Sequence, residues 1–216
     1  MIKSLLQTSV FKTLRFNFHY FGFSGIIKPR IYLAHNVKLE KLTGNCLAPK
    51  GSKIKVGYFE NFAEEGSHKH VLFSNEGILD FTGGGQCISK GCSIFVDKDA
   101  KLTLGKRVHI GPNTGLDCHK SITINDETMV AWNCLIMDRD GHDIIDLNTS
   151  NILNPIEAVE IGEHCWICSN SIILKGSIIP NHSVVAAKSI ITKKLEKSNC
   201  IYVNNNIVRE NIDIKF

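Results

Sequence analysis

The residues of this chain that could hold a metal or carry redox chemistry are eight cysteines and nine histidines. Cys165 and Cys168 form the only C-x-x-C pair, and no second pair or histidine arrangement completes a zinc site. No two histidines stand five residues apart, and the His-Lys-His run at 68–70 lies outside the regular part of the chain. We therefore expect no metal, and we interpret the cysteines as small buried thiols of a reducing compartment.

Phosphate-loop and nucleic-acid sites are also disfavoured. The glycine run at 83–85 is not followed by Lys-Ser or Lys-Thr and has no strand-to-helix setting, so it predicts a turn. The formal net charge is only +4, and the chain has no basic run and no recognition-helix pattern. No nucleic-acid partner is expected.

The N-terminal stretch 2–21 mixes apolar residues with Lys3, Lys12 and Arg15. It lacks the unbroken apolar core of a signal peptide, and no run in the chain reaches the ~20 apolar residues needed to cross a bilayer. We expect a cytoplasmic protein. The stretch predicts an amphipathic helix that packs on its own chain, with contact to a partner or to the inner face of the membrane as the alternative.

Residues 161–192 repeat every six positions. A period of six fits neither an α-helix nor a simple strand alternation. It predicts a coil with three flat sides, in which aliphatic residues stack inside every 18 residues and neighbouring coils pair as parallel strands. The first position of each hexad is aliphatic and the fifth is small: Ile161, Ile167, Ile173, Ile179, Val185 and Ile191 lead, and Cys165, Ser171, Ser177, Ser183 and Ser189 follow.

The same spacing returns upstream, with a two-residue slip, and residues 142–160 then interrupt it with Asn, Asp and Pro. An insertion into a solenoid predicts a loop on one face, often the binding face. We predict an all-β protein with an N-terminal helical or irregular extension over 1–50, a β-helix over 51–192 and a tail over 193–216. The upstream inward positions are Ile88, Ile94, Leu104, Ile110, Leu116, Ile124, Val130 and Ile136.

The residue before each inward aliphatic should point outward, because neighbours along a strand alternate. In the last block all of these residues are apolar, and so much outward apolar surface should be covered by something. They are Trp166, Ile172, Ile178, Val184 and Ile190.

At these residues the sequence resembles the hexapeptide-repeat acyltransferases, in particular their cell-surface polysaccharide O-acetyltransferase branch. The match covers residues 78–192, through ITINDETMVAWNCLIMDRDGHDI and VEIGEHCWICSNSIILKGSIIPNHSVVAAKSIITK. The resemblance implies a left-handed coil and a homotrimer with active sites in clefts between subunits. It also implies acetyl-CoA as co-substrate and a sugar hydroxyl as acceptor.

His142, in the segment MDRDGHDI, falls on the family's catalytic histidine. A sugar hydroxyl is a poor nucleophile, and its attack on a thioester requires removal of its proton as the bond forms. A neutral imidazole that titrates near physiological pH suits this task, so we expect His142 to be the general base. Asp138, Asp140 or a backbone carbonyl is expected to keep the other ring nitrogen protonated.

The resemblance places acetyl-CoA along the last coils. Trp166 matches the tryptophan of the family's Trp-Ile-Gly motif, and we expect it either to wall the cleft or to pack in the subunit interface. The amides of Ala186 and Ala187 correspond to those that contact the pantetheine arm. Clustered cations attract phosphate, so four are expected to meet the CoA nucleotide: Lys188, Lys193, Lys194 and Arg209.

Three positions depart from the family pattern. Cys168 replaces the glycine after Trp-Ile and adds a side chain where the cofactor passes close to the backbone. Pro180 replaces the glycine after Ile179 and removes an amide donor. The terminal Gly-Asn-Pro-Ala signature is replaced by VNNNIVRE from Val203, in which asparagine tolerates the left-handed conformation of a glycine.

Two other functions stay open. An N-acetyltransferase acting on an amino group of a nucleotide-linked sugar would use the same fold and the same base. A non-catalytic β-helix scaffold would explain the repeat but leave the His142 loop without a role. A metal hydratase of this fold needs three histidines converging on zinc, which the histidine spacing does not predict.

Overall fold

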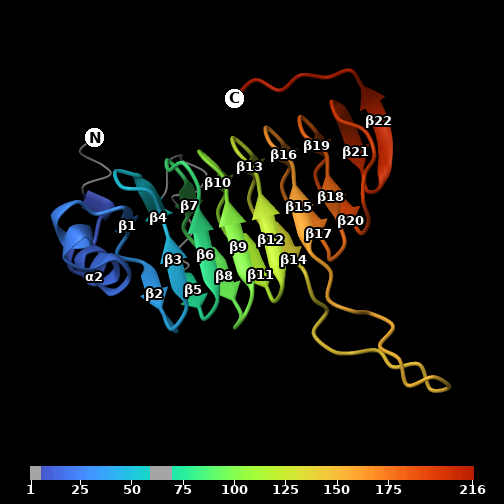
Figure 1. Ribbon diagram of the computed structural model, residues 1–216. Helices are drawn as coiled ribbons and strands as arrows, with labels where there is room; N and C mark the ends of the chain where they lie inside the picture. The colour runs from blue at the N-terminus through green and yellow to red at the C-terminus, as the bar shows by residue number, and fades with distance from the viewer. Residues whose placement is uncertain (1–5, 59–69) are drawn as a thin grey trace.

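The computed structural model describes residues 6–58 and 70–216. Helix α2 (Val10–Ile27) precedes a stack of short strands that form three sheets (Figure 1). The nine-stranded sheet contains β1 (Ile31–Leu33), β4 (Ile54–Tyr58), β7 (Cys87–Ser89), β10 (His109–Ile110), β13 (Met129–Val130), β16 (Trp166–Ile167), β19 (Val184–Val185), β21 (Cys200–Val203) and β22 (Asn206–Glu210).

The other two sheets form the remaining sides of the prism. The seven-stranded sheet contains β2 (Val37–Leu39), β5 (Val71–Asn75), β8 (Ser93–Val96), β11 (Gly115–Cys118), β14 (Leu135–Met137), β17 (Ile172–Ile173) and β20 (Ile190–Ile191). The six-stranded sheet contains β3 (Asn45–Leu47), β6 (Ile78–Phe81), β9 (Lys101–Leu104), β12 (Ser121–Ile124), β15 (Val159–Ile161) and β18 (Ile178–Ile179).

The chain visits the three sheets in rotation through β20, so each of these strands pairs in parallel with the strand one coil away. Ile167 pairs with Val185, 18 residues on, as the hexad period predicts. All the inward residues predicted from the period are buried. The two-residue slip falls before β12, a four-residue strand in which both Ile122 and Ile124 are buried. The predicted parallel β-helix is confirmed.

The corners of the last coils share one conformation. The residue before the small fifth residue of each hexad has a positive φ, as at Asn170 (61°) and Gly176 (74°). Small side chains then turn inward and close the corner: Ser171 Oγ donates to the carbonyl of Ala186, and Ser177 Oγ donates to that of Ile191. Positive φ is uncommon outside glycine, so its recurrence shows that the chain turns from one face to the next at the fourth hexad position.

Helix α2 closes the N-terminal end of the prism. Phe16 is fully buried and meets Phe73 edge to face at 5.4 Å. Asn17 Nδ2 donates to the carbonyl of Ile31 (2.6 Å), which joins the helix to β1. Strands β1–β3 lie within 1–50, the range that we assigned to an extension, so the β-helix begins at Ile31. Corners of unequal length hide the period in this first coil. Within the described residues, no helix is long and apolar enough to span a bilayer.

The range 193–216, predicted as a tail, closes the other end. Strand β21 pairs in parallel with β19, and β22 folds back on β21 as an antiparallel hairpin. At its turn, Asn204 adopts the left-handed conformation (φ 53°) expected of an asparagine in place of glycine. The side chains of Asn204 and Asn205 accept the amides of Ile190 and Thr192, so they substitute for a further strand beside β20. The last residues return along the edge of the prism (Figure 1).

Candidate functional site

The insertion between β14 and β15 projects away from the prism as a narrow loop (Figure 1). Two strand-like segments of the loop meet at an antiparallel bridge between Ile145 and Ile152. The base of the loop is joined by Asn154. Its Nδ2 donates both to Asp140 Oδ2 (2.9 Å) and to the carbonyl of His142 (2.9 Å), while its Oδ1 accepts the amide of Ile144 (2.6 Å). One side chain from the returning strand therefore holds the outgoing strand on both sides of His142.

A lysine on the next coil braces this base. Lys175 Nζ lies 2.8 Å from Asp140 Oδ2 and 3.2 Å from the carbonyl of Pro155. The hydrogen bond from Lys175, and then that from Asn154, lower the pKa of Asp140 below its ordinary value. Lys175 follows the insertion by one coil, so it contacts both strands of the loop from below. Sequence reasoning missed Lys175 and Asn154, because neither belongs to the hexad pattern or to the family motif.

His142 is exposed near the start of this braced segment. Among the described residues, no hydrogen bond or ion pair reaches its ring; the contact from Asn154 is to its backbone carbonyl. The structure thus brings His142 and Asp140 together on one loop base. Within a single chain it leaves the imidazole facing outward.

Asp138 occupies a different setting. Its carboxylate is fully buried and accepts three backbone amides, those of His119 (2.7 Å), Lys120 (2.8 Å) and Ser121 (2.7 Å). Its own carbonyl accepts the amide of Glu157 (3.2 Å), where the loop returns. Both oxygens of Asp138 are therefore engaged by backbone amides of the 119–121 corner.

The outward rows predicted from the period are present. Trp166 stacks on Val184 across β16 and β19, Ile172 stacks on Ile190 across β17 and β20, and Ile178 lies on the third sheet. Trp166 keeps 40% of its surface exposed. Two residues further on, Cys168 is half-buried, and burial raises its pKa to about 11. Trp166 and Cys168 therefore line one outward face, with the Cys168 side chain at the position where the motif has a glycine.

The residues expected near acetyl-CoA lie on the last coils. The amide of Ala186 donates to Tyr202 O (2.8 Å), so the coil itself uses that donor. Ala187 and Lys188 are exposed at the adjoining corner, where Lys188 has a φ of 61°. The other three predicted cations are also exposed, on the segment after β20 and on β22: Lys193, Lys194 and Arg209.

All eight cysteines are free thiols, and seven of them are buried. Cys165 lies inside the corner before β16, where its thiol donates to the carbonyl of Pro180 (3.2 Å). Burial raises the pKa of Cys165 to about 11, so this thiol is uncharged at neutral pH. These positions agree with the expectation of buried structural thiols.

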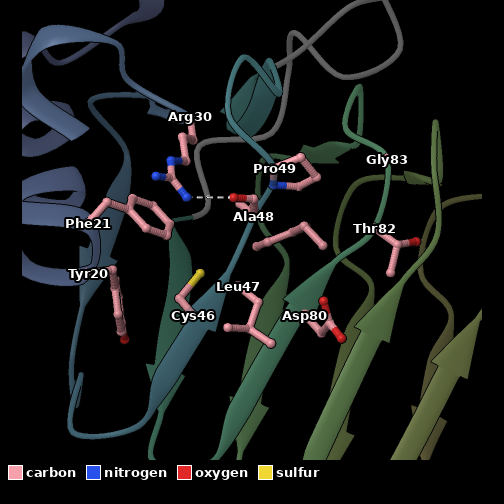
Figure 2. Close-up of a pocket in the computed structure, with 11 residues that line it drawn as sticks. Tyr20, Phe21, Arg30, Cys46, Leu47, Ala48, Pro49, Asp80, Thr82 and Gly83 are labelled. Atoms are coloured by element: carbon pink, nitrogen blue, oxygen red, sulfur yellow. Dashed lines mark hydrogen bonds between the residues drawn. The ribbon is translucent and has the colours of Figure 1, made fainter. Parts of the chain in front are cut away.

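A separate hollow of about 710 Å³ opens where α2 meets β3 and β6 (Figure 2). Arg30 stands in it, but its guanidinium donates to the carbonyl of Ala48 (2.7 Å) and lies over the Phe21 ring at 4.3 Å. Burial raises the pKa of Tyr20, on the same wall, to about 12. The polar groups of this hollow hold α2 on the coils, and we assign it no reaction.

No family model matches the chain. It is 30% identical over 122 residues to a polysialic acid O-acetyltransferase of Escherichia coli O1:K1, a match that covers 55% of this chain and 39% of the relative. The chain therefore spans about two fifths of the length of that relative. It is also 26% identical over 215 residues to an uncharacterized 24.8 kDa protein in the cps region of Klebsiella pneumoniae, across 98% of this chain and 93% of that protein.

Among solved structures, the fold resembles that of the polySia-specific acetyltransferase NeuO with a TM-score of 0.64. The alignment covers 85% of this chain and 82% of NeuO at 23% identity. This likeness confirms the expected left-handed sense of the coil. By its period, its prism of three parallel sheets and its likeness to NeuO, the chain has the left-handed parallel β-helix fold, and its sequence is similar to that of a polysialic acid O-acetyltransferase.

Proposed function

We propose that the protein transfers an acetyl group from acetyl-CoA to a sugar hydroxyl of a cell-surface polysaccharide or its precursor. The observation that carries the proposal is His142, an exposed imidazole on a loop base that Asn154 and Lys175 hold rigidly against the next coil. A catalytic base must be held in position, and the contacts of Asn154 and Lys175 supply such positioning at the base of the loop. The relatives named for polysialic acid acetylation support the same reaction class.

In this proposal the His142 ring takes the proton of the acceptor hydroxyl as its oxygen bonds to the thioester carbon. The tetrahedral intermediate then collapses, the carbon–sulfur bond breaks, and the imidazolium returns the proton to the departing CoA thiolate. Asp140 acts indirectly, since its carboxylate and the His142 carbonyl share one donor group on Asn154. Asp138 shapes the corner beneath the loop.

Acetyl-CoA would lie along the outward face of the last coils. Trp166 walls this face, and the exposed residues Ala187 and Lys188 form the corner that would meet the pantetheine arm. The cations Lys193, Lys194 and Arg209 would meet the nucleotide phosphates, since all are exposed near the C-terminal end of the prism. Cys168 replaces a glycine beside this path, so we expect the arm to pass further from the backbone here.

We propose a homotrimer as the working unit. The outward rows of Trp166, Ile172 and Ile190 keep apolar surface exposed on a single chain, and a second and third copy would cover it. A neighbouring subunit would also supply the missing wall around the outward-facing His142. Sedimentation equilibrium should report about three times the 24.1 kDa chain mass. A stable, active monomer would refute the shared cleft.

We propose that the protein is cytoplasmic and that α2 contacts the inner face of the membrane. The outer side of the helix exposes Phe11 and Phe23, each 76% accessible, together with Phe18. The first 39 residues contain no acidic residue, so this surface is cationic as well as apolar. Anionic vesicles should bind the wild-type chain more than a Phe11→Ser, Phe23→Ser variant, and neutral vesicles should bind both poorly. Equal binding of the two chains would contradict it.

The decisive experiment transfers labelled acetyl from acetyl-CoA to a panel of surface glycans and nucleotide-linked amino sugars. His142→Ala should lower the rate by about 10²–10⁴-fold, the usual contribution of a general base. The matched control is His70→Ala, which removes an exposed histidine of the N-terminal coils. Alkali-labile product identifies an ester, and alkali-stable product an amide. Full activity in a folded His142→Ala protein would remove the proposed base, and transfer to the amino sugars alone would favour the N-acetyltransferase.

A further inference from the structure

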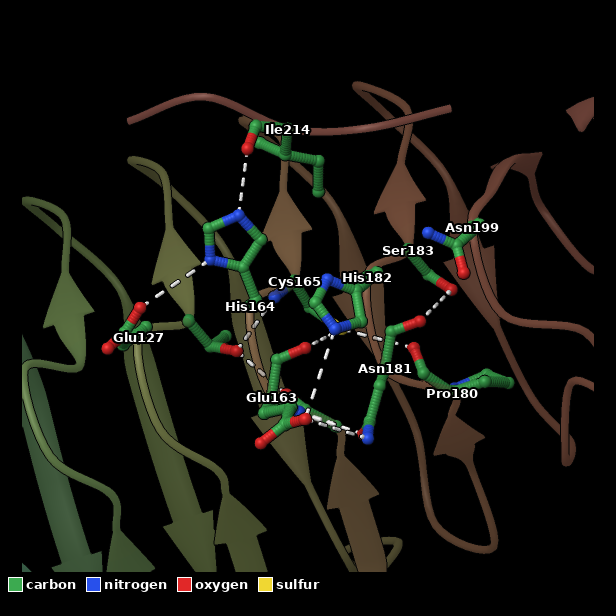
Figure 3. Close-up of polar contacts among 12 residues, drawn as sticks. Glu127, Glu163, His164, Cys165, Pro180, Asn181, His182, Ser183, Asn199 and Ile214 are labelled. Carbon is green, nitrogen blue, oxygen red and sulfur yellow. Dashed lines mark hydrogen bonds and ion pairs between the residues drawn. The ribbon is translucent and has the colours of Figure 1, made fainter. Parts of the chain in front are cut away.

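We propose that His164, His182 and Asp213 bind a divalent transition metal that fastens the C-terminal segment to the side of the β-helix. One donor atom from each of the three residues lies within 4.8 Å of the others. Figure 3 shows the two rings on neighbouring coils, beneath the segment that carries Ile214. The proposal is independent of the acetyl-transfer reaction.

Coil stacking is what creates this group. His164 and His182 both occupy the fourth position of a hexad, 18 residues apart, and both have positive φ (52° and 56°). Their ring centroids are 5.3 Å apart. Glu127 and Asn199 stand at the same corner of the preceding and following coils, also with positive φ. Backbone bonds from coil to coil continue this row, so its side chains leave the prism in register.

The hydrogen bonds of His164 leave it ready to coordinate. Its Nε2 lies 2.8 Å from the carbonyl of Ile214, and a carbonyl only accepts, so Nε2 carries the proton. In the neutral ring Nδ1 then holds the lone pair, and a histidine ligand that donates its other nitrogen to a carbonyl is the usual arrangement at metals. The Phe216 ring, 4.9 Å away, packs on the same imidazole.

The charges around the rings favour a cation. A pocket of about 400 Å³ is lined by both histidines together with four carboxylates, those of Asp126, Glu127, Glu163 and Asp213. Glu127 Oε2 lies 3.8 Å from His164 Nδ1, and Glu163 Oε1 lies 3.9 Å from His182 Nε2. Both distances exceed a hydrogen bond, so the ring nitrogens face negative charge without donating to it.

Two imidazoles and a carboxylate select the class of metal. Nitrogen-rich donor sets suit zinc, cobalt, nickel and copper, whereas magnesium and calcium prefer oxygen alone. Ligand bonds of about 2.0–2.2 Å require the donor atoms to close together from the present spacing. Asp213 can supply that movement, because it is exposed on the terminal segment that follows β22. We predicted no metal because we considered only the spacing of histidines along the sequence. That spacing does not reveal residues that coil stacking brings together at one corner.

A metal here would act on structure. Ile212 N donates to the carbonyl of Asn199 (3.0 Å), and the carbonyl of Ile214 accepts from His164 Nε2. These two hydrogen bonds already hold the C-terminal segment against three successive coils. Coordination by Asp213, between them, would close this strap. His164 precedes β16 by two residues, so the strap would also steady the coil that presents Trp166.

The test uses the full chain, free of any histidine tag, titrated with Co²⁺ and Zn²⁺ after dialysis against a chelator. We expect one Co²⁺ per chain with visible absorption of a four- or five-coordinate ion, and a higher Tm with Zn²⁺. His182→Asn keeps a residue that tolerates the left-handed corner, and Asp213→Asn keeps the shape of the side chain. Each should weaken binding by more than about tenfold. The control is His35→Asn, which alters an exposed histidine of the first coil.

Two results would overturn the proposal. One is the absence of stoichiometric Co²⁺ binding by the wild-type chain, which would make the row a surface cluster of histidines and carboxylates. The other is equal metal affinity in His182→Asn, Asp213→Asn and His35→Asn. Thermal unfolding of each apo variant shows whether it is folded. If His182→Asn does not fold, Asp213→Asn still tests the proposal, because Asp213 lies on the exposed segment.

Discussion

Replacement of Asp138 should test how the corner at the base of the 142–160 loop is held. The carboxylate is fully buried and accepts three backbone amides at 2.7–2.8 Å. Asp138→Ala removes the acceptor of those three part-buried amides, at about 1–3 kcal/mol each. Partial entry of water reduces the sum, so we expect a loss of about 3–6 kcal/mol. That is a large fraction of the roughly 5–15 kcal/mol by which a domain is stable.

Asp138→Asn refines the test, because it keeps the volume and one acceptor oxygen. Oδ2 accepts the amides of Lys120 and Ser121, whereas Oδ1 accepts only that of His119. An asparagine should therefore place its oxygen on the side with two amides and its NH₂ against His119. One bond is lost and two donors face each other, which should cost about 2 kcal/mol.

The assay is urea unfolding followed by far-ultraviolet circular dichroism at fixed chain concentration, with the slope of the transition compared between variants. The control is Asp146→Ala. The Asp146 carboxylate also accepts two amides, 2.7 and 2.9 Å away, but it lies at the tip of the loop, where water replaces it. We expect no measurable change for the control. An Asp138→Ala protein as stable as the control would refute the dependence of these three amides on the carboxylate.

Three further predictions follow from the same structure. Ile173→Asp puts an unpaired charge inside the prism at a cost of several kcal/mol, so the chain should be insoluble or unfolded. The control Ile144→Asp, on the exposed loop, should express normally, and a wild-type Tm for Ile173→Asp would contradict the inward register. Lys175 depresses the pKa of Asp140 below 3.8, so the ion pair that braces the loop is complete above that pH and is lost as the pH falls through the lowered pKa. Protease cleavage of the loop should rise in that range in the wild-type chain, and should not depend on acid in Asp140→Asn. Cys168, whose pKa is about 11, should react slowly with Ellman's reagent at pH 8, and fast labelling of the native chain would disprove the burial on which that value depends.

The central coils and the end segments differ in how far sequence alone could describe them. Each inward aliphatic from Leu104 to Ile191 is placed by a local rule, since one residue in six must face the interior whatever the rest of the chain does. The first coil has no such rule. Its strands at Ile31, Val37 and Asn45 are separated by corners of unequal length, and only pairing with the next coil defines them.

The candidate site divides in the same way. Residue type and motif were enough to single out His142 and Trp166, because an imidazole within a motif and an outward tryptophan are recognisable one residue at a time. The bracing of His142 by Asn154 and Lys175 depends on the path of the loop back to the coil, which no spacing encodes.

Sequence by itself determined the period, the inward column and the position of the interruption, because each arises from chemistry repeated at short range. Tertiary structure alone decided which side chains of different coils meet. Asp138 reaches a corner 17 to 19 residues before it, and His164 meets His182 because one full coil lies between them. In a parallel coil, residues that are one coil apart in the sequence become neighbours in space. Coil length therefore decides which residues meet at a corner, and both the loop and the two-residue slip change that length.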